Sequence, residues 1–350
     1  MSQTADPYVS KSVTDKFGRR VRDLRISVTD RCNFRCPYCM PAEVYVEKYE
    51  FLPRPHILSF EEIERLTRLF VRIGVSKVRI TGGEPLVRAN LPDLVSKLCV
   101  IDGINDVALT TNGYLLENNA QQLKDAGLNR LTVSLDSIDP DVFKEMSGRP
   151  QGPTNTLAGI KTAASLGFKQ IKINVVVQRG VNEHTLVDTA RYFKGTGAIV
   201  RFIEFMDVGT KNGWELSQVF PSDEVIQAIN AEFPLEPIEP NYKGEVASRY
   251  RYVDGSGEIG VISSVSKPFC GDCTRARLST DGKLITCLFA SGGTDLKTPM
   301  RSGATDAELA AIINKVWTGR NDRYSELRSN DTEFENDSDD SKVEMYYIGG

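Results

Sequence analysis

The feature that most constrains the fold is an alternation of short β-branched runs with amphipathic stretches over residues 22–206. The runs that we interpret as strands are residues 24–30, 77–81, 106–111, 130–136, 171–178 and 199–206. One of the stretches between them opens with a capping box at Ser59 and Glu62. Six β/α units in a row predict a parallel sheet with right-handed crossovers. An incomplete barrel and a doubly wound sheet both satisfy this pattern, and the absence of a GxGxxG turn after any strand favours the barrel.

One face of several predicted strands is polar, because side chains alternate with period two along a strand. The polar sets are Arg25, Ser27 and Thr29; Lys77, Arg79 and Thr81; Thr132, Ser134 and Asp136; and Lys172 and Asn174. A half-solvated antiparallel sheet also alternates in this way, but the intervening helices should cover the outer face. The pattern therefore predicts an open lumen lined for a polar, anionic ligand. The sixth strand departs from it, since Arg201 has the opposite parity to Glu204 and Met206.

The regular alternation of predicted strands and helices ends after residue 207. A helix is predicted near residues 222–230, hairpins turn at Gly255–Gly257 and at Asp281–Gly282, and a capped helix follows at residues 305–317. We expect an N-terminal arm over residues 1–20, a partial barrel over 21–215, a smaller α+β region over 216–325, and a flexible tail over 326–350 that ends in Gly-Gly.

Charge and composition exclude several classes of protein. The 43 basic and 47 acidic residues leave no general basic footprint for nucleic acid. The sequence contains no apolar stretch of bilayer length and no signal-peptide core, which predicts a cytoplasmic protein without structural disulfides. The only two histidines, His56 and His184, stand apart from other potential ligands. Histidine-based catalysis and an imidazole-rich metal site are therefore not expected.

Six of the seven cysteines fall into two triads. The first is Cys32, Cys36 and Cys39, and the second is Cys270, Cys273 and Cys287. Cys99 stands alone in an apolar run, and we expect it to be a small buried side chain. Three thiolates leave a [4Fe–4S] cube with one iron open to a ligand, so the spacing predicts two such clusters. The alternatives are a zinc knuckle or thiol redox motif for the first triad, and a zinc ribbon with a non-cysteine ligand for the second.

The motifs around these cysteines resemble a known family. CNFRCPYC (residues 32–39) after the first strand and TGGEP (81–85) after the second resemble the radical S-adenosylmethionine superfamily. RDLRISVTDRCNFRCPYCMP, LTTNGY, RFIEFMDVG, CGDCTRARLS and the terminal Gly-Gly resemble, within it, the GTP 3′,8-cyclases of molybdenum cofactor biosynthesis. The resemblance covers essentially the whole chain from Arg22 onward, whereas residues 1–20 and the acidic stretch 332–340 match nothing diagnostic. It implies a lyase that converts GTP to (8S)-3′,8-cyclo-7,8-dihydroguanosine 5′-triphosphate after a 5′-deoxyadenosyl radical abstracts hydrogen from ribose C3′.

The resemblance also implies roles for individual residues. Each cysteine triad would hold a [4Fe–4S] cluster, the second with GTP on its open iron. The residues matching S-adenosylmethionine contacts are Tyr38, Gly83, Ser134 and Met206. Those matching GTP contacts are Arg25, Arg79, Thr110, Lys172, Arg275, Ala276 and Arg277, with Lys77 as a further phosphate partner. Gly349 and Gly350 would reach into the site and assist late radical chemistry.

The expected partners follow from the same resemblance. They are an electron donor such as flavodoxin or ferredoxin and a downstream cyclic pyranopterin monophosphate synthase, and a homodimer is compatible with the family. Nucleic acid and membranes are not expected as partners. The competing interpretations are a radical S-adenosylmethionine enzyme that modifies peptides with an auxiliary cluster, and a zinc-stabilised binding module without chemistry.

Overall fold

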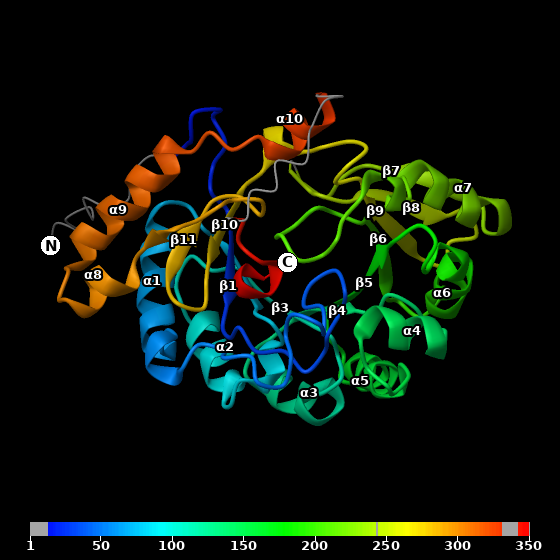
Figure 1. Ribbon diagram of the computed structural model, residues 1–350, viewed down its shortest axis with the longest axis horizontal. Helices are drawn as coiled ribbons and strands as arrows, with labels where there is room; N and C mark the ends of the chain where they lie inside the picture. Colours follow the sequence, from blue (N-terminus) through cyan, green and yellow to red (C-terminus); the bar gives the residue numbers. More distant parts are fainter. Residues whose placement is uncertain (1–12, 243, 331–341, 350) are drawn as a thin grey trace, which may run out of the picture.

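The computed structural model describes residues 13–242, 244–330 and 342–349, which are built around one curved twelve-stranded sheet (Figure 1). The strands that the sequence predicted are β1 (Asp23–Ser27), β2 (Lys77–Thr81), β3 (Asp106–Thr111), β4 (Arg130–Ser134), β5 (Gln170–Val177) and β6 (Ile199–Glu204). They lie side by side in chain order, and every neighbouring pair is parallel. The predicted α/β fold with a parallel, open barrel-like sheet is confirmed.

Helices cover the outer side of this curved sheet (Figure 1). They are α1 (Phe60–Arg72), α2 (Leu91–Cys99), α3 (Leu116–Asp125), α4 (Pro140–Ser147), α5 (Thr154–Ser165), α6 (Leu186–Phe193) and α7 (Ser222–Glu232). Short 3-10 helices are η1 (Arg54–His56), η2 (Pro85–Val87), η3 (Glu183–Thr185), η4 (Leu216–Gln218) and η5 (Cys270–Asp272). The capping box predicted for α1 is present, with the Glu62 N–H donating to Ser59 Oγ at 3.2 Å.

The C-terminal region supplies strands to both edges of the six-stranded core. Its strands are β7 (Leu235–Ile238), β8 (Ser248–Tyr252), β9 (Glu258–Ile262), β10 (Arg275–Leu278), β11 (Lys283–Ile285) and β12 (Thr294–Asp295). The predicted hairpins β8–β9 and β10–β11 are present. In addition, β10 pairs in parallel with β1 and β9 pairs in parallel with β6, so both edges of the predicted barrel sheet are covered.

The remaining helices are α8 (Lys297–Arg301), α9 (Asp306–Gly319), α10 (Tyr324–Asn330) and α11 (Met345–Ile348). The capping box predicted for α9 is present at Thr305 and Glu308. Within the segment predicted to be a flexible tail, α11 lies inside the arc of the sheet, near the C label of Figure 1. Residues 331–341 and Gly350 are outside the described residues, and the domain boundaries stay predictions.

The core is the apolar layer between the sheet and its helices. Leu24 and Ile26 of β1 are fully buried in it, together with Leu66 and Phe70 of α1. Because side chains alternate along a strand, Arg25 between those two residues points to the opposite, inner side. Among the described helices, none is both long enough and apolar enough to cross a bilayer.

Candidate active site

The first thiol triad lies in the loop that follows β1. This loop carries Cys32, Cys36 and Cys39. The backbone N–H of Phe34 donates to Cys32 Sγ at 3.3 Å, and the Arg35 guanidinium ties the loop together by donating to the Tyr45 carbonyl at 2.8 Å. The loop thus presents its thiols at the carboxyl end of a parallel strand, where ligands bind in such folds.

The Gly-rich turn after β2 packs tightly against the start of this loop. The N–H of Gly83 donates to the Thr29 carbonyl at 2.7 Å, and that of Glu84 to the Arg31 carbonyl at 2.8 Å. A Cβ placed on Gly83 would lie 2.4 Å from the Arg31 carbonyl oxygen, so a side chain does not fit there. The glycine is therefore needed to join the turn to the cysteine loop, in addition to the predicted role in approaching a cofactor.

A small pocket opens beside the first triad. Cys36, Tyr38 and Ser134 line it, with Asp136 on the same side. The Tyr38 hydroxyl donates to Asp136 Oδ2 at 2.7 Å, and burial raises the pKa of Asp136 to about 6. Two of the four residues predicted to contact S-adenosylmethionine therefore meet next to a triad cysteine. Met206 lines the larger cavity described next.

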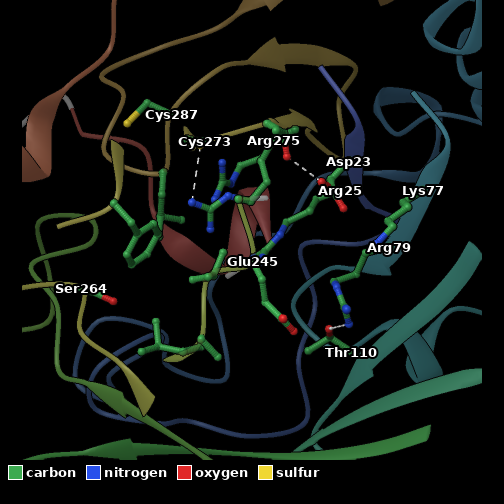
Figure 2. A pocket seen from close by; sticks show the side chains of 18 of the residues that line it. Asp23, Arg25, Lys77, Arg79, Thr110, Glu245, Ser264, Cys273, Arg275 and Cys287 are labelled. Carbon is green, nitrogen blue, oxygen red and sulfur yellow. Dashed lines mark hydrogen bonds between the residues drawn. The ribbon is translucent and has the colours of Figure 1, made fainter. Parts of the chain in front are cut away.

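A cavity of about 200 Å³ lies on the inner side of the sheet, and Figure 2 shows Arg25, Arg79 and Arg275 converging on it. The residues predicted to contact GTP that line it are Arg25, Lys77, Arg79, Thr110, Lys172, Arg275 and Arg277. All three thiols of the second triad line the same cavity: Cys270, Cys273 and Cys287. The side chain of Ala276 instead packs in the apolar core, and this residue does not line the cavity. The structure thus brings together cations and thiols from opposite ends of the sequence.

The cations in this cavity are crowded and poorly compensated. Burial lowers the pKa of Arg25, and the neighbouring charges of Arg277 and Arg275 lower it further. Burial and then the charges of Arg79 and Arg130 lower the pKa of Arg201 to about 9. Each of these shifts means that burial and neighbouring cations destabilise the positive charge. A bound polyanion would relieve that cost, since it pairs with the guanidinium groups through charge-assisted hydrogen bonds.

The same guanidinium groups act on the second triad. Arg275 Nη2 donates to Cys273 Sγ at 3.5 Å (Figure 2). Burial alone would raise the pKa of Cys273, but the charges of Arg275 and Arg320 outweigh it and hold the pKa at about 6. The lowered pKa favours the thiolate form of Cys273 at neutral pH, which is the form that binds metals.

A buried ion-pair network fixes the loop that carries this triad. Asp15 of the N-terminal arm pairs with Arg19 and with Arg320, and all three side chains are almost fully buried. Arg19 Nη1 donates to the Cys270 carbonyl at 2.7 Å, and Arg320 Nη1 to the Cys273 carbonyl at 2.8 Å. Both arginines also line the cavity.

Comparisons with known proteins agree over nearly the whole chain. Residues 26–193 match the model of the radical SAM superfamily, and residues 198–326 match that of Molybdenum Cofactor Synthesis C. A GTP 3′,8-cyclase of Acidothermus cellulolyticus is 49% identical over 98% of this chain and 100% of its own length. One of Staphylococcus carnosus is 50% identical over 97% of this chain and 99% of its own length. The chain belongs to the GTP 3′,8-cyclase family of radical S-adenosylmethionine enzymes.

The solved structures support the fold of this GTP 3′,8-cyclase family member. Streptococcus suis SuiB bound to S-adenosylmethionine matches with a TM-score of 0.60 at 15% identity, over 89% of this chain and 69% of that one. At this identity the likeness concerns the fold alone. It does not favour the peptide-modifying interpretation over the cyclase family.

The thiols suit the iron–sulfur chemistry of the family. A donor N–H points at Cys32 Sγ and a guanidinium points at Cys273 Sγ, which are contacts that stabilise cluster thiolates. Burial raises the pKa of the triad thiols Cys32, Cys36, Cys39 and Cys287, so these would lose their protons as they bind iron. Within the part of the chain that the structure describes, no three Cys, His, Asp or Glu side chains are grouped tightly enough to chelate a single metal ion. The thiolates of a cube bind different irons, so their ligands stand farther apart than those of a mononuclear site.

Several residues of this GTP 3′,8-cyclase site were missed from the sequence. Arg201 lines the cavity beside Ile203, with its guanidinium donating to Asn174 Oδ1 at 2.7 Å. The alternation of side chains along the sixth strand did not identify Arg201 as a site residue. The face that carries Arg201 also carries the apolar Ile203, and the opposite face carries the buried Glu204. Arg19 and Arg320 were missed because no local sequence pattern links the N-terminal arm, or the residue that follows α9, to the second triad.

Proposed function

We propose that the chain converts GTP to (8S)-3′,8-cyclo-7,8-dihydroguanosine 5′-triphosphate, the first step of molybdenum cofactor biosynthesis. The observation that carries the proposal is the cavity in which the second cysteine triad meets a set of buried cations. A triphosphate carries about four negative charges, and clustered arginines bind its oxygens bidentately. Near-full-length identity of about 50% to curated cyclases supports the same activity.

In this proposal the two triads hold two [4Fe–4S] clusters. Cys32, Cys36 and Cys39 hold the first, and Cys270, Cys273 and Cys287 hold the second. The first cluster and S-adenosylmethionine together supply the 5′-deoxyadenosyl radical that abstracts hydrogen from ribose C3′. Tyr38, Gly83, Ser134 and Met206 orient S-adenosylmethionine, and the Tyr38–Asp136 hydrogen bond keeps the tyrosine ring fixed.

The cavity residues place the substrate. Arg25, Lys77, Arg79, Thr110, Lys172, Arg275, Ala276 and Arg277 bind GTP. Arg79 is already oriented, because its Nη1 donates to Thr110 Oγ1 at 3.0 Å and to Thr132 Oγ1 at 2.9 Å. Holding ribose and guanine in one fixed geometry favours bond formation between C3′ and C8. Gly349 and Gly350 assist the late radical step, and Gly350 lies outside the described residues.

The partners belong to the same proposal. An electron donor such as flavodoxin or ferredoxin reduces the enzyme, and a cyclic pyranopterin monophosphate synthase consumes the product. A cytoplasmic location and a homodimer accompany this assignment.

The test uses enzyme purified and reconstituted without oxygen. We expect about eight irons per chain, binding of GTP by calorimetry, and cyclised product by mass spectrometry in step with 5′-deoxyadenosine. Arg277→Ala should reduce GTP binding, whereas Arg65→Ala, at a half-exposed ion pair on the outer surface, should not. Zinc in place of iron, or 5′-deoxyadenosine formation without cyclised product, would contradict the proposal.

A further inference from the structure

The C-terminal segment Lys342–Gly349 lies between the two cysteine triads. At its start, the N–H of Val343 donates to the Ala290 carbonyl at 2.9 Å, three residues beyond Cys287. Further along, Tyr346 packs with Met40 and Tyr45 in a cluster that also contacts Cys32 and Cys39. A segment of eight residues therefore touches the loops of both triads.

A carboxylate fastens this segment to the loop after β6. Glu344 Oε1 accepts hydrogen bonds from Thr210 N at 3.0 Å and from Thr210 Oγ1 at 2.8 Å. The neighbouring Gly209 has a φ of 76°, and a Cβ there would lie 2.3 Å from Glu344 Oε2. The loop therefore has the backbone shape and the bare position that the carboxylate needs.

The same loop also holds α10. Asp207 accepts hydrogen bonds from the Tyr324 hydroxyl at 2.5 Å and from Arg328, and it lies 3.6 Å from Lys342 Nζ. The turn after β6 is thus the common attachment of α10 and of the terminal segment.

Tyr346 provides the second attachment point. Only 8% of the residue is exposed, its ring lies 5.0 Å from that of Tyr45 in an edge-to-face arrangement, and its hydroxyl lies 3.1 Å from that of Tyr49. A tyrosine buried this far contributes both apolar area and aromatic contact.

These two attachments determine where Gly349 lies. Gly349 has a φ of 69°, its N–H donates to the Met345 carbonyl at 2.9 Å, and a Cβ on it would lie 1.7 Å from Thr81 Oγ1. Thr81 is the last residue of β2 and opens the TGGEP turn. The penultimate glycine is therefore pressed onto the turn that meets the first triad.

We propose that Glu344 and Tyr346 are positioning residues, which dock the C-terminal segment across the site and hold Gly349 against Thr81. This inference rests on the role proposed above for the terminal glycines. It separates two tasks: the anchors keep the segment in place, and Gly349 occupies a position that no side chain could share.

The experiment measures docking and catalysis separately. Reconstituted enzyme and the variants Glu344→Ala, Tyr346→Ala and Thr210→Val are exposed to carboxypeptidase Y, and the loss of C-terminal residues is followed by intact mass. We expect release about tenfold faster than in the unaltered enzyme, because each variant removes contacts that oppose local opening. The kcat for cyclised product should fall by at least about tenfold, with the KM for GTP and the iron content unchanged.

Two comparisons make the outcome decisive. Glu344→Gln keeps an oxygen acceptor and should lie between the alanine variant and the unaltered enzyme. Glu117→Ala and Tyr192→Ala, at exposed positions on the outer helices, should change neither readout. Release from Glu344→Ala and Tyr346→Ala at the rate of the unaltered enzyme, or faster release with an unchanged kcat, would overturn the inference. Failure of the unaltered enzyme to form product would instead contradict the proposed function, and the release rates would still report on docking.

Discussion

Arg19 connects the N-terminal arm to the second triad through a single buried side chain. Its guanidinium pairs with Asp15 and donates to the Cys270 and Asp322 carbonyls. We expect Arg19→Ala to leave Asp15 only partly compensated and to loosen the Cys270 loop, at a cost of about 3–5 kcal/mol in the free energy of unfolding. Iron should fall from about eight to about four per chain as the second cluster is lost. Mössbauer spectra and thermal unfolding would check both effects.

A surface ion pair provides the control for this variant. Arg65 and Asp306 are both more than one-third exposed, so Arg65→Ala should cost no more than about 1 kcal/mol and leave the iron content unchanged. Full iron content in Arg19→Ala would show that the second triad does not depend on the arm.

We predict that Lys172 makes the binding of GTP depend on pH. Burial, followed by the charges of Arg201 and Arg130, lowers the pKa of Lys172 to about 7. The triphosphate favours the ammonium form, so binding takes up no proton at Lys172 below pH 7 and about one proton above it. GTP affinity should therefore weaken as the pH rises above 7, by up to about tenfold per unit. Calorimetry at pH 6 and pH 8 in buffers of different ionisation enthalpy measures the uptake.

Lys172→Arg is the matched control for that measurement. An arginine stays charged throughout this range, so the difference in proton uptake between the two proteins isolates Lys172 from the titration of the phosphate itself. Identical uptake at pH 8 in both proteins would contradict the prediction.

At the scale of elements, the turn after β2 has to contact the cysteine loop directly. Gly83→Ala would place a methyl group 2.4 Å from the Arg31 carbonyl oxygen, which should cost about 1–3 kcal/mol and displace the first triad. We expect loss of the first cluster with retention of the second, measured by iron content and Mössbauer spectra. Gly292→Ala is the control, because nothing lies within 4 Å of a Cβ at that position. Two intact clusters in Gly83→Ala would contradict this prediction, because they would show that the turn can move away from the Arg31 carbonyl without displacing the first triad.

The strands show how far the sequence predicts the elements. Residues 77–81 and 106–111 match β2 and β3 at both ends, because β-branched runs between helices leave a strong local signal. Helix α4 was missed although Asp139 and Pro140 are typical of a helix start, and the Asp139 carboxylate does cap it.

The pairing of β10 with β1 could not be predicted, because contacts between segments about 250 residues apart leave no periodic pattern in the sequence. The inward arginines of the first strands were predictable from parity, whereas Arg201 was not.

At the scale of the whole molecule, the C-terminal region completes the sheet. Arg277 lies in register with Arg25 across β10 and β1, and Gly260 with Arg201 across β9 and β6. The cavity proposed to bind GTP therefore has one wall from each part of the chain. Neither the predicted barrel region nor the C-terminal region contains the complete site.

This arrangement predicts how a truncated chain behaves. A chain that ends at residue 215 loses β7–β12 and exposes the hydrogen-bonding edges of β1 and β6. Exposed edges of parallel strands pair with other chains, so we expect this fragment to aggregate, whereas a chain that ends at residue 330 keeps the whole sheet. Light scattering after size-exclusion chromatography distinguishes the two, and thermal unfolding shows whether either melts cooperatively. A soluble, cooperatively melting fragment would mean that the six-stranded unit is stable by itself and that the C-terminal strands serve the cavity rather than the fold.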